Sequence, residues 1–166
     1  MKKVLYIISI FTFISCQTEI DKIKNSDSIE ECIGNVTRHI NQCFEDSNQI
    51  EIDEKADYDF ENNILIVYKG KSTTDYFQKW EIPLAELDPN RIEIKKEGIS
   101  IKKITVFTKN NEPKIRYFKD GKKESNPFQN NYHLKDYCFD KKNGIEIFFE
   151  SYKRAILLAQ NKKSEL

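Results

Sequence analysis

The spacing of apolar residues changes near residue 47, and this change constrains the fold more than any other feature of the chain. From Ser28 to about Asp46 apolar residues recur every three or four positions, which predicts one amphipathic helix. Ser28 and Glu31 have the spacing of a capping box, so the helix is expected to begin there. After Ser47 apolar and polar residues alternate, as in strands with one buried face. The pattern therefore predicts an N-terminal helix joined to a largely β body.

Short alternating stretches separated by turn residues predict about seven strands after this helix. Asn62-Asn63 marks a hairpin because asparagine tolerates positive φ, and a bulge at Lys102-Lys103 would restore the alternation there. Lys119 to Asn130 is expected as a mobile loop, Ile145 to Glu150 as a strand, and the chain from Ser151 as a final helix.

The expected fold class is α+β. It consists of an antiparallel β-sandwich or a partly open barrel of about seven strands, with an N-terminal helix and a C-terminal capping helix. In element order alone this resembles the pleckstrin-homology type of architecture. Such a resemblance implies nothing about function, because one fold can carry many activities.

The charge is unevenly distributed. Gln17 to Leu65 holds 13 acidic and 4 basic residues, a net charge of −9, whereas Arg91 to Glu124 holds 11 basic and 5 acidic residues, a net charge of +6. The whole chain balances 27 basic against 27 acidic residues, which argues against a general nucleic-acid binder. The asymmetry indicates either a partner surface or two solvated faces of one domain.

The first sixteen residues have the organisation of an export signal. Lys2 and Lys3 are followed by an apolar run, Val4 to Ile14, and then by the small residue Ser15. The run is shorter than the roughly 20 residues that a spanning helix needs. Phe13-Ile14-Ser15-Cys16 resembles the lipobox of bacterial lipoproteins, although that family usually has Leu, Val or Ile in the position of Phe13.

The resemblance implies that Cys16 receives a diacylglyceryl group and becomes the acylated N-terminus. The expected organisation is a signal peptide at 1–15, a lipidated cysteine and polar tether at 16–27, and one globular domain at 28–166. The alternatives are an ordinary secretory signal and an uncleaved anchor. The expected location is the bacterial cell envelope, on a membrane through the N-terminal lipid, and Gln17 favours the outer membrane by the same resemblance.

Three further cysteines bear on stability. Cys32 and Cys43 share the predicted helix, where they lie about 16 Å apart along its axis. A disulfide allows at most about 7 Å between Cα atoms, so these two cannot pair. Since an exported chain meets an oxidising compartment, either can pair with Cys138, and three buried free thiols are the alternative.

Residues that could carry chemistry are few. His39 and Cys43 lie four positions apart, a spacing that could contribute to a metal site, but the other ligands are missing and no cofactor or metal is expected. His133 and Cys138 lie on opposite faces of one continuous strand, which excludes a local thiolate–imidazole pair. Three alternating carboxylates are expected to form a solvated face: Asp57, Asp59 and Glu61.

The export signal, together with the lack of a catalytic motif, favours a lipid-anchored, non-catalytic binding or accessory module. Its expected partners are the membrane and an envelope protein or glycan. An inhibitor or immunity-type lipoprotein and a small hydrolase are the alternatives. Trp80 and Tyr76 could stack on sugars, but core packing is favoured. The candidate partner contacts lie on the predicted loop, where function is often found: Lys119, Lys122 and Lys123.

Overall fold

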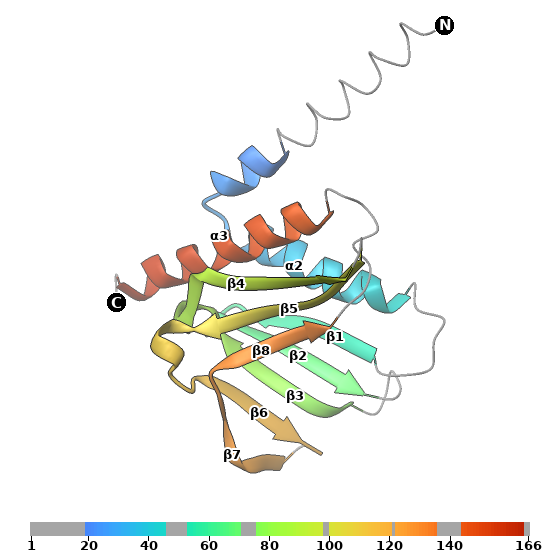
Figure 1. Ribbon diagram of the computed structural model, residues 1–166. Coiled ribbons are helices and arrows are strands. Elements are labelled where there is room, and N and C mark those ends of the chain that lie inside the picture. The colour runs from blue at the N-terminus through green and yellow to red at the C-terminus, as the bar shows by residue number, and fades with distance from the viewer. Residues whose placement is uncertain are drawn as a thin grey trace, which may run out of the picture.

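The computed structural model describes residues 19–45, 53–70, 76–97, 100–120, 122–135 and 144–164 (Figure 1). Residues 19–24 are helical and precede the longer helix α2. The elements that follow are α2 (Ile29–Glu45), β1 (Asp53–Asp59), β2 (Ile64–Gly70), β3 (Tyr76–Pro83), η1 (Leu84–Glu86), β4 (Leu87–Glu97), β5 (Ser100–Thr108), η2 (Lys109–Asn111), β6 (Ile115–Lys119), β7 (Lys122–Gln129), β8 (Asn131–Lys135) and α3 (Gly144–Ser164). The predicted α+β class and its order of helix, strands and helix are confirmed.

The strands form two antiparallel sheets. The larger sheet has the order β1-β2-β3-β6-β7, and the smaller has the order β4-β5-β8. A single residue, Asn130, separates β7 from β8, so the chain changes sheets at that corner. The two sheets of the described strands are arranged as in a sandwich, one of the two predicted arrangements, and they do not close into a barrel.

Two local predictions about the strands are confirmed. The β1–β2 hairpin turns at Asn63, which has a φ of 54°, a conformation that asparagine tolerates better than most residues. The register of β4 against β5 shifts beside Lys103, where Lys102 has no partner in the ladder. This extra residue is the expected bulge.

The predicted strand at Ile145 to Glu150 is wrong, because these residues form the first turns of α3. A short apolar run does not distinguish a strand from a buried helix. Helical spacing continues from Phe148 to Tyr152 and Ile156, so one long helix buries all three side chains. Ser151, where the final helix was expected to begin, is therefore buried within the helix.

The predicted loop at Lys119 to Asn130 is also wrong. β6 continues to Lys119, the chain turns at Asp120, and β7 returns along β6. Charged residues and Pro127 made this stretch resemble a loop. They are compatible with a strand here because β7 lies at an edge of the sheet, where lysines and proline are common.

The helices lie side by side on one side of the sandwich (Figure 1). α2 packs against β1, α3 packs against β4 and η1, and the two helices contact each other. The core between these layers contains side chains from both sheets and both helices, including Ile33, Val36, Leu65, Val67, Ile82, Ile104, Val106, Tyr132, Phe148, Tyr152 and Ile156.

Side-chain amides from the helices bond to the outer edge strands. The Asn41 amide of α2 donates to the carbonyl of Ala56 in β1 at 3.0 Å and accepts from its N–H at 2.7 Å. The Gln160 amide of α3 donates to the carbonyl of Leu87 in β4 at 2.7 Å. The helices therefore cover the β1 and β4 edges, whereas among the described strands β7 pairs only with β6 and β8 only with β5.

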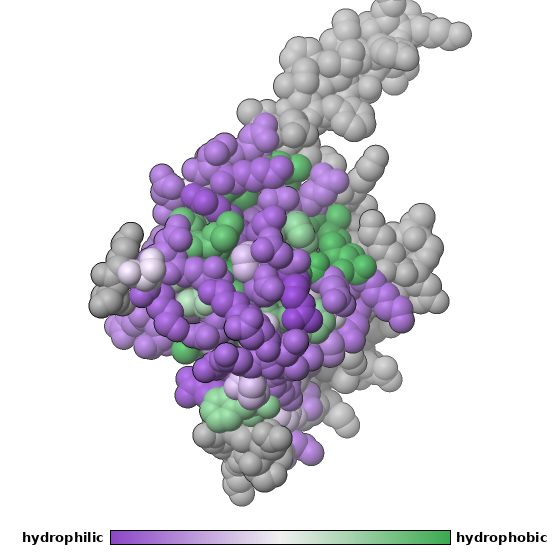
Figure 2. Space-filling view, turned by 60° about the vertical axis from the view of Figure 1, so that its left-hand side comes forward, coloured by the Kyte–Doolittle hydropathy of each residue, from purple (hydrophilic) through white to green (hydrophobic). Residues whose placement is uncertain are grey.

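The surface is mostly polar. The face drawn in Figure 2 is largely hydrophilic, and its hydrophobic residues occur in separate groups. Two large apolar side chains of the described residues are exposed, Phe60 beside the β1–β2 turn and Phe128 on β7. Within the described residues, no helix has the length and apolar character needed to cross a bilayer.

Candidate functional site

The segment that follows the candidate lipidation site is packed onto the domain. Residues 19–24 form a helical turn whose Ile20 and Ile23 are only 6% and 2% exposed. Ser26 after it is also buried. The sequence predicts a polar tether here, but from Glu19 onward the chain is part of the packed structure.

Arg154 of α3 holds this segment. Its Nε donates to the backbone carbonyl of Ser26 at 2.6 Å, and its Nη2 lies 3.2 Å from a carboxylate oxygen of Asp27. Asp27 is 97% exposed, so solvent screens its ion pair with the guanidinium. The bond to the partly buried carbonyl of Ser26 is therefore the stronger of the two contacts.

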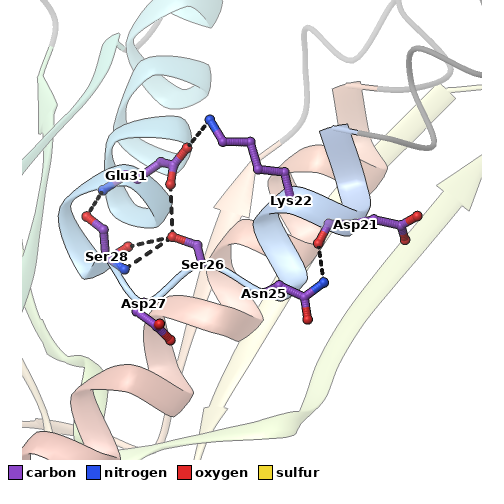
Figure 3. Close-up of a pocket in the computed structure, with 7 residues that line it drawn as sticks. All are labelled: Asp21, Lys22, Asn25, Ser26, Asp27, Ser28 and Glu31. Atoms are coloured by element: carbon purple, nitrogen blue, oxygen red, sulfur yellow. Dashed lines mark hydrogen bonds and ion pairs between the residues drawn. The ribbon is translucent and has the colours of Figure 1, made fainter.

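A second set of contacts joins the same segment to α2 (Figure 3). The Ser26 hydroxyl donates to the carboxylate of Glu31 at 2.9 Å, and Lys22 pairs with that carboxylate at 3.0 Å. The Lys22 ammonium and the Ser26 hydroxyl hold the pKa of the Glu31 carboxyl below its usual value. We call the four residues Lys22, Ser26, Glu31 and Arg154 the N-terminal clasp.

The clasp modifies the predicted capping box. The Ser28 hydroxyl accepts from the N–H of Glu31 at 3.1 Å, as expected. The carboxylate of Glu31 turns to Ser26 and Lys22, and the N–H of Ser28 donates to the Ser26 hydroxyl at 3.2 Å instead. Ser26 thus accepts the hydrogen bond from the Ser28 N–H that the Glu31 carboxylate accepts in a capping box.

An open pocket lies beside the clasp, between the first helical turn and the start of α2 (Figure 3). Every residue that lines it has a polar or charged side chain, although their carbon atoms supply most of its surface: Asp21, Lys22, Asn25, Ser26, Asp27, Ser28 and Glu31. Across the residues that the structure describes, no group of three His, Cys, Asp or Glu side chains is placed to hold a metal ion.

The three lysines expected to contact a partner lie on the β6–β7 hairpin. Lys119 and Lys122 are directly opposite each other, and Lys123 is opposite Phe118. Next to them, the Lys79 ammonium lies 4.4 Å from the centre of the Phe118 ring. The structure thus brings the lysines together, but at the end of a β-hairpin and not on a long loop.

An ion pair inside the sandwich was not predicted from the sequence. Lys69 of β2 is directly opposite Glu54 of β1, and their charged groups pair in the interior. The Lys69 ammonium lies 5.1 Å from the centre of the Trp80 ring and 5.4 Å from that of Tyr132. Lys69 alternates with Val67 on the face of β2 that the structure buries, but the sequence alone does not mark this face because the other face is apolar as well.

Two tyrosine hydroxyls are buried in the same core. Those of Tyr132 and Tyr152 have no hydrogen-bond partner among the described residues. Burial raises the pKa of the Tyr132 phenol well above its usual value, and it also raises that of Tyr152. Both rings therefore act as neutral core side chains.

Of the cysteines, only Cys32 has a described side chain. It is a free, fully buried thiol, and burial raises its pKa, which disfavours the reactive thiolate. Cys16, Cys138 and the side chain of Cys43 lie outside the described part of the chain. Lipidation of Cys16 and a disulfide involving Cys138 remain predictions.

The two histidines occupy separate places. The Nδ1 of His39 donates to the carbonyl of Asn35 one turn earlier on α2 at 2.8 Å, and its ring meets the Phe148 ring edge-on. His133 on β8 is exposed, and its Nδ1 lies 3.0 Å from the Thr105 hydroxyl on β5. These are structural contacts within the fold.

The candidate acids are on β1 and its turn. Asp57 is exposed, and Asp59 accepts from the N–H groups of Glu61 and Asn62, which stabilises the turn. Trp80 is 9% exposed, with its ring centre 5.0 Å from that of Tyr117, so the favoured core role is confirmed. The side chain of Tyr76 lies outside the described part.

Comparison with known proteins finds no matching family model, no similar curated protein and no similar solved structure.

Proposed function

We propose that this chain is a lipid-anchored lipoprotein of the bacterial cell envelope that acts as a non-catalytic binding module. One observation carries the proposal: basic Lys2 and Lys3, an apolar run and a small residue before Cys16 occur in the order that lipoprotein export requires. Acylation of Cys16 with two or three chains would hold the domain stably on a membrane, because a single chain binds only marginally.

The partner contact is proposed at the end of the β6–β7 hairpin. Lys119, Lys122 and Lys123 occupy neighbouring positions there, and Lys119 is exposed. Three positive charges at one hairpin end favour an anionic surface of an envelope protein or glycan. Figure 1 supports this assignment, because the hairpin lies at the end of the molecule away from α2 and α3.

Lipidation is tested by mass spectrometry of the mature N-terminus of the protein expressed with its full leader. We expect a product that begins at Cys16, carries the mass of the acyl chains and partitions into detergent. Cys16→Ser should remove the added mass and the detergent partitioning, while Gln17→Asn serves as the matched control and should retain both. An unmodified wild-type N-terminus would exclude the anchor.

The partner site is tested by capture from envelope extracts. Replacing Lys119, Lys122 and Lys123 together with glutamine should abolish retention of the partner. The matched control replaces three exposed lysines elsewhere: Lys95, Lys109 and Lys162. Equal retention by both triple variants would exclude the hairpin as the contact.

An inhibitor or immunity-type role is the second candidate. The observation that favours it is the same hairpin, because lysines clustered at its end can bind the acidic rim of a partner's active-site cleft. A strain that lacks the protein should then become sensitive to a toxin or to lysozyme, and the hairpin variant should fail to restore resistance. Full resistance of the deletion strain to both would exclude this role.

A further inference from the structure

We infer that the surface around the N-terminal clasp is the face of the domain that lies against the bilayer, and that Arg154 fixes this orientation. The inference rests on the proposed lipidation of Cys16. It adds an interaction surface, a partner and a positioning residue. Lipidation alone does not supply these, because a domain joined to an acylated cysteine by a long flexible linker could rotate freely.

The first step is the length of chain between the lipid and the fold. Only Gln17 and Thr18 separate Cys16 from Glu19, the first described residue. Three Cα–Cα steps span at most about 11 Å even when fully extended. The headgroup region on each side of the hydrocarbon core is about 5–8 Å thick. Residue 19 must therefore lie at or just above the headgroups.

The second step is the attachment of this segment to the rest of the domain. Ile20 and Ile23 are buried, so residues 19–24 cannot unfold to lengthen the linker after Cys16 without exposing apolar surface. Beyond them, the Ser26 carbonyl is bonded to Arg154 of α3 and the Ser26 hydroxyl to Glu31 of α2. The segment is thus joined to both helices, and the helices form part of the core.

The third step is the placement of the opposite end. In Figure 1 the helical turn at residues 19–24 lies next to α3 on one side of the molecule, and the β6–β7 hairpin lies on the other. A domain held at the clasp therefore presents Lys119 away from the bilayer. The pocket lining at the clasp includes Asp21, Asp27 and Glu31, so attraction to anionic lipids does not supply this contact. The acyl chains and the short connection from Cys16 to Glu19 hold this face against the bilayer.

The test uses the full acylated protein in vesicles of phosphatidylethanolamine and phosphatidylglycerol at three to one, and the same protein in detergent micelles. After mass spectrometry has confirmed the acylated N-terminus, a lysine-acetylating reagent is applied and the rate at each lysine is measured. We expect Lys22 and Lys24 to react severalfold more slowly on vesicles than in micelles. Lys119 should react at the same rate in both.

Arg154→Gln tests the positioning role. Trypsin cleavage after Lys22 and Lys24 should become about tenfold to a hundredfold faster, the range expected for loss of a hydrogen bond to a charged group. On vesicles, the difference in acetylation between Lys24 and Lys119 should shrink. Arg116→Gln, which removes an ion pair on the larger sheet, is the matched control and should change neither readout. Circular dichroism verifies that each variant is folded.

The outcomes separate this inference from the proposed function. An unacylated N-terminus would remove the proposed anchor itself. An acylated protein whose Lys24 and Lys119 change equally between micelles and vesicles would overturn the bilayer-facing surface and leave the anchor intact. Wild-type cleavage and acetylation in Arg154→Gln would overturn the role of Arg154 alone.

Discussion

The two ends of the sandwich differ in whether helices cover their edge strands. At one end α2 and α3 cover β1 and β4, and the amides of Asn41 and Gln160 bond to backbone groups of those strands. At the other end β7 and β8 each have a described partner on one side only. An uncovered edge can pair with another chain, and lysines and proline reduce that hazard. The helices therefore protect the strand edges at the covered end, and the edges at the open end are available for contacts.

The largest effect is expected in the interior between the two sheets, from Lys69→Met. This change leaves the carboxylate of Glu54 without its ammonium inside the sandwich, and breaking a buried ion pair costs about 3–5 kcal/mol of unfolding free energy. Urea denaturation followed by circular dichroism measures the loss.

The matched control is the double variant Lys69→Met with Glu54→Leu. Because it removes both charges, it should recover much of the stability that the single variant loses. A double variant less stable than Lys69→Met would show that the pair does not act as a unit.

A smaller loss is expected from Asn41→Ala on α2. The change removes two hydrogen bonds to Ala56 and exposes the covered edge of β1, at a cost of about 2 kcal/mol. Hydrogen exchange at the Ala56 amide should accelerate. The control is Asn35→Ala, at another position on α2, which removes one side-chain bond to Ser151 of α3 and should leave the Ala56 amide unchanged. Equal exchange in the two variants would refute the role of Asn41 at the edge.

At the open side of the larger sheet, Arg116→Gln should cost about 0.2–1 kcal/mol at most, the usual range for an exposed ion pair. Arg116 lies 2.8 Å from Glu81 and is 44% exposed. The difference from wild type should vanish in high salt, because salt screens exposed charges. A loss as large as that of Asn41→Ala would contradict the contrast between the two ends.

The sequence predicted the fold well where one periodic pattern ran without interruption. The stripe from Ser28 to Asp46, the turn at Asn63 and the bulge beside Lys103 depend on local geometry, and the structure confirms them. The prediction from the sequence was wrong at Ile145 to Glu150 and at Lys119 to Asn130. In both places the local pattern fitted two structures, and contacts with distant elements decided between them.

The site was less predictable for the same reason. The clasp joins Ser26 to Arg154, 128 positions later, and no local spacing relates the two. The Lys69–Glu54 pair could not be found in this way, because both faces of β2 carry apolar side chains and only the packing shows that the face with Val67 and Lys69 is buried. The clustering of Lys119, Lys122 and Lys123 follows from the hairpin register, which an expected loop does not have.

The smallest expected effect concerns the open β8 edge. Partial desolvation of the imidazole, followed by the Lys103 and Lys69 charges, lowers the pKa of His133 below its usual 6.5. As the pH falls from 6.5 toward the lowered pKa, the unfolded chain binds a proton that the folded chain does not, so stability declines across that interval and is fully retained above it. The ring is exposed, so the decline should be slight. Proton NMR of the imidazole should show the lowered pKa, and His133→Gln should remove the decline.

Since Lys69 contributes to the shift, Lys69→Met should move the His133 pKa upward, which would link the interior ion pair to the open edge. An unchanged midpoint in that variant would show that the Lys69 charge does not act on His133.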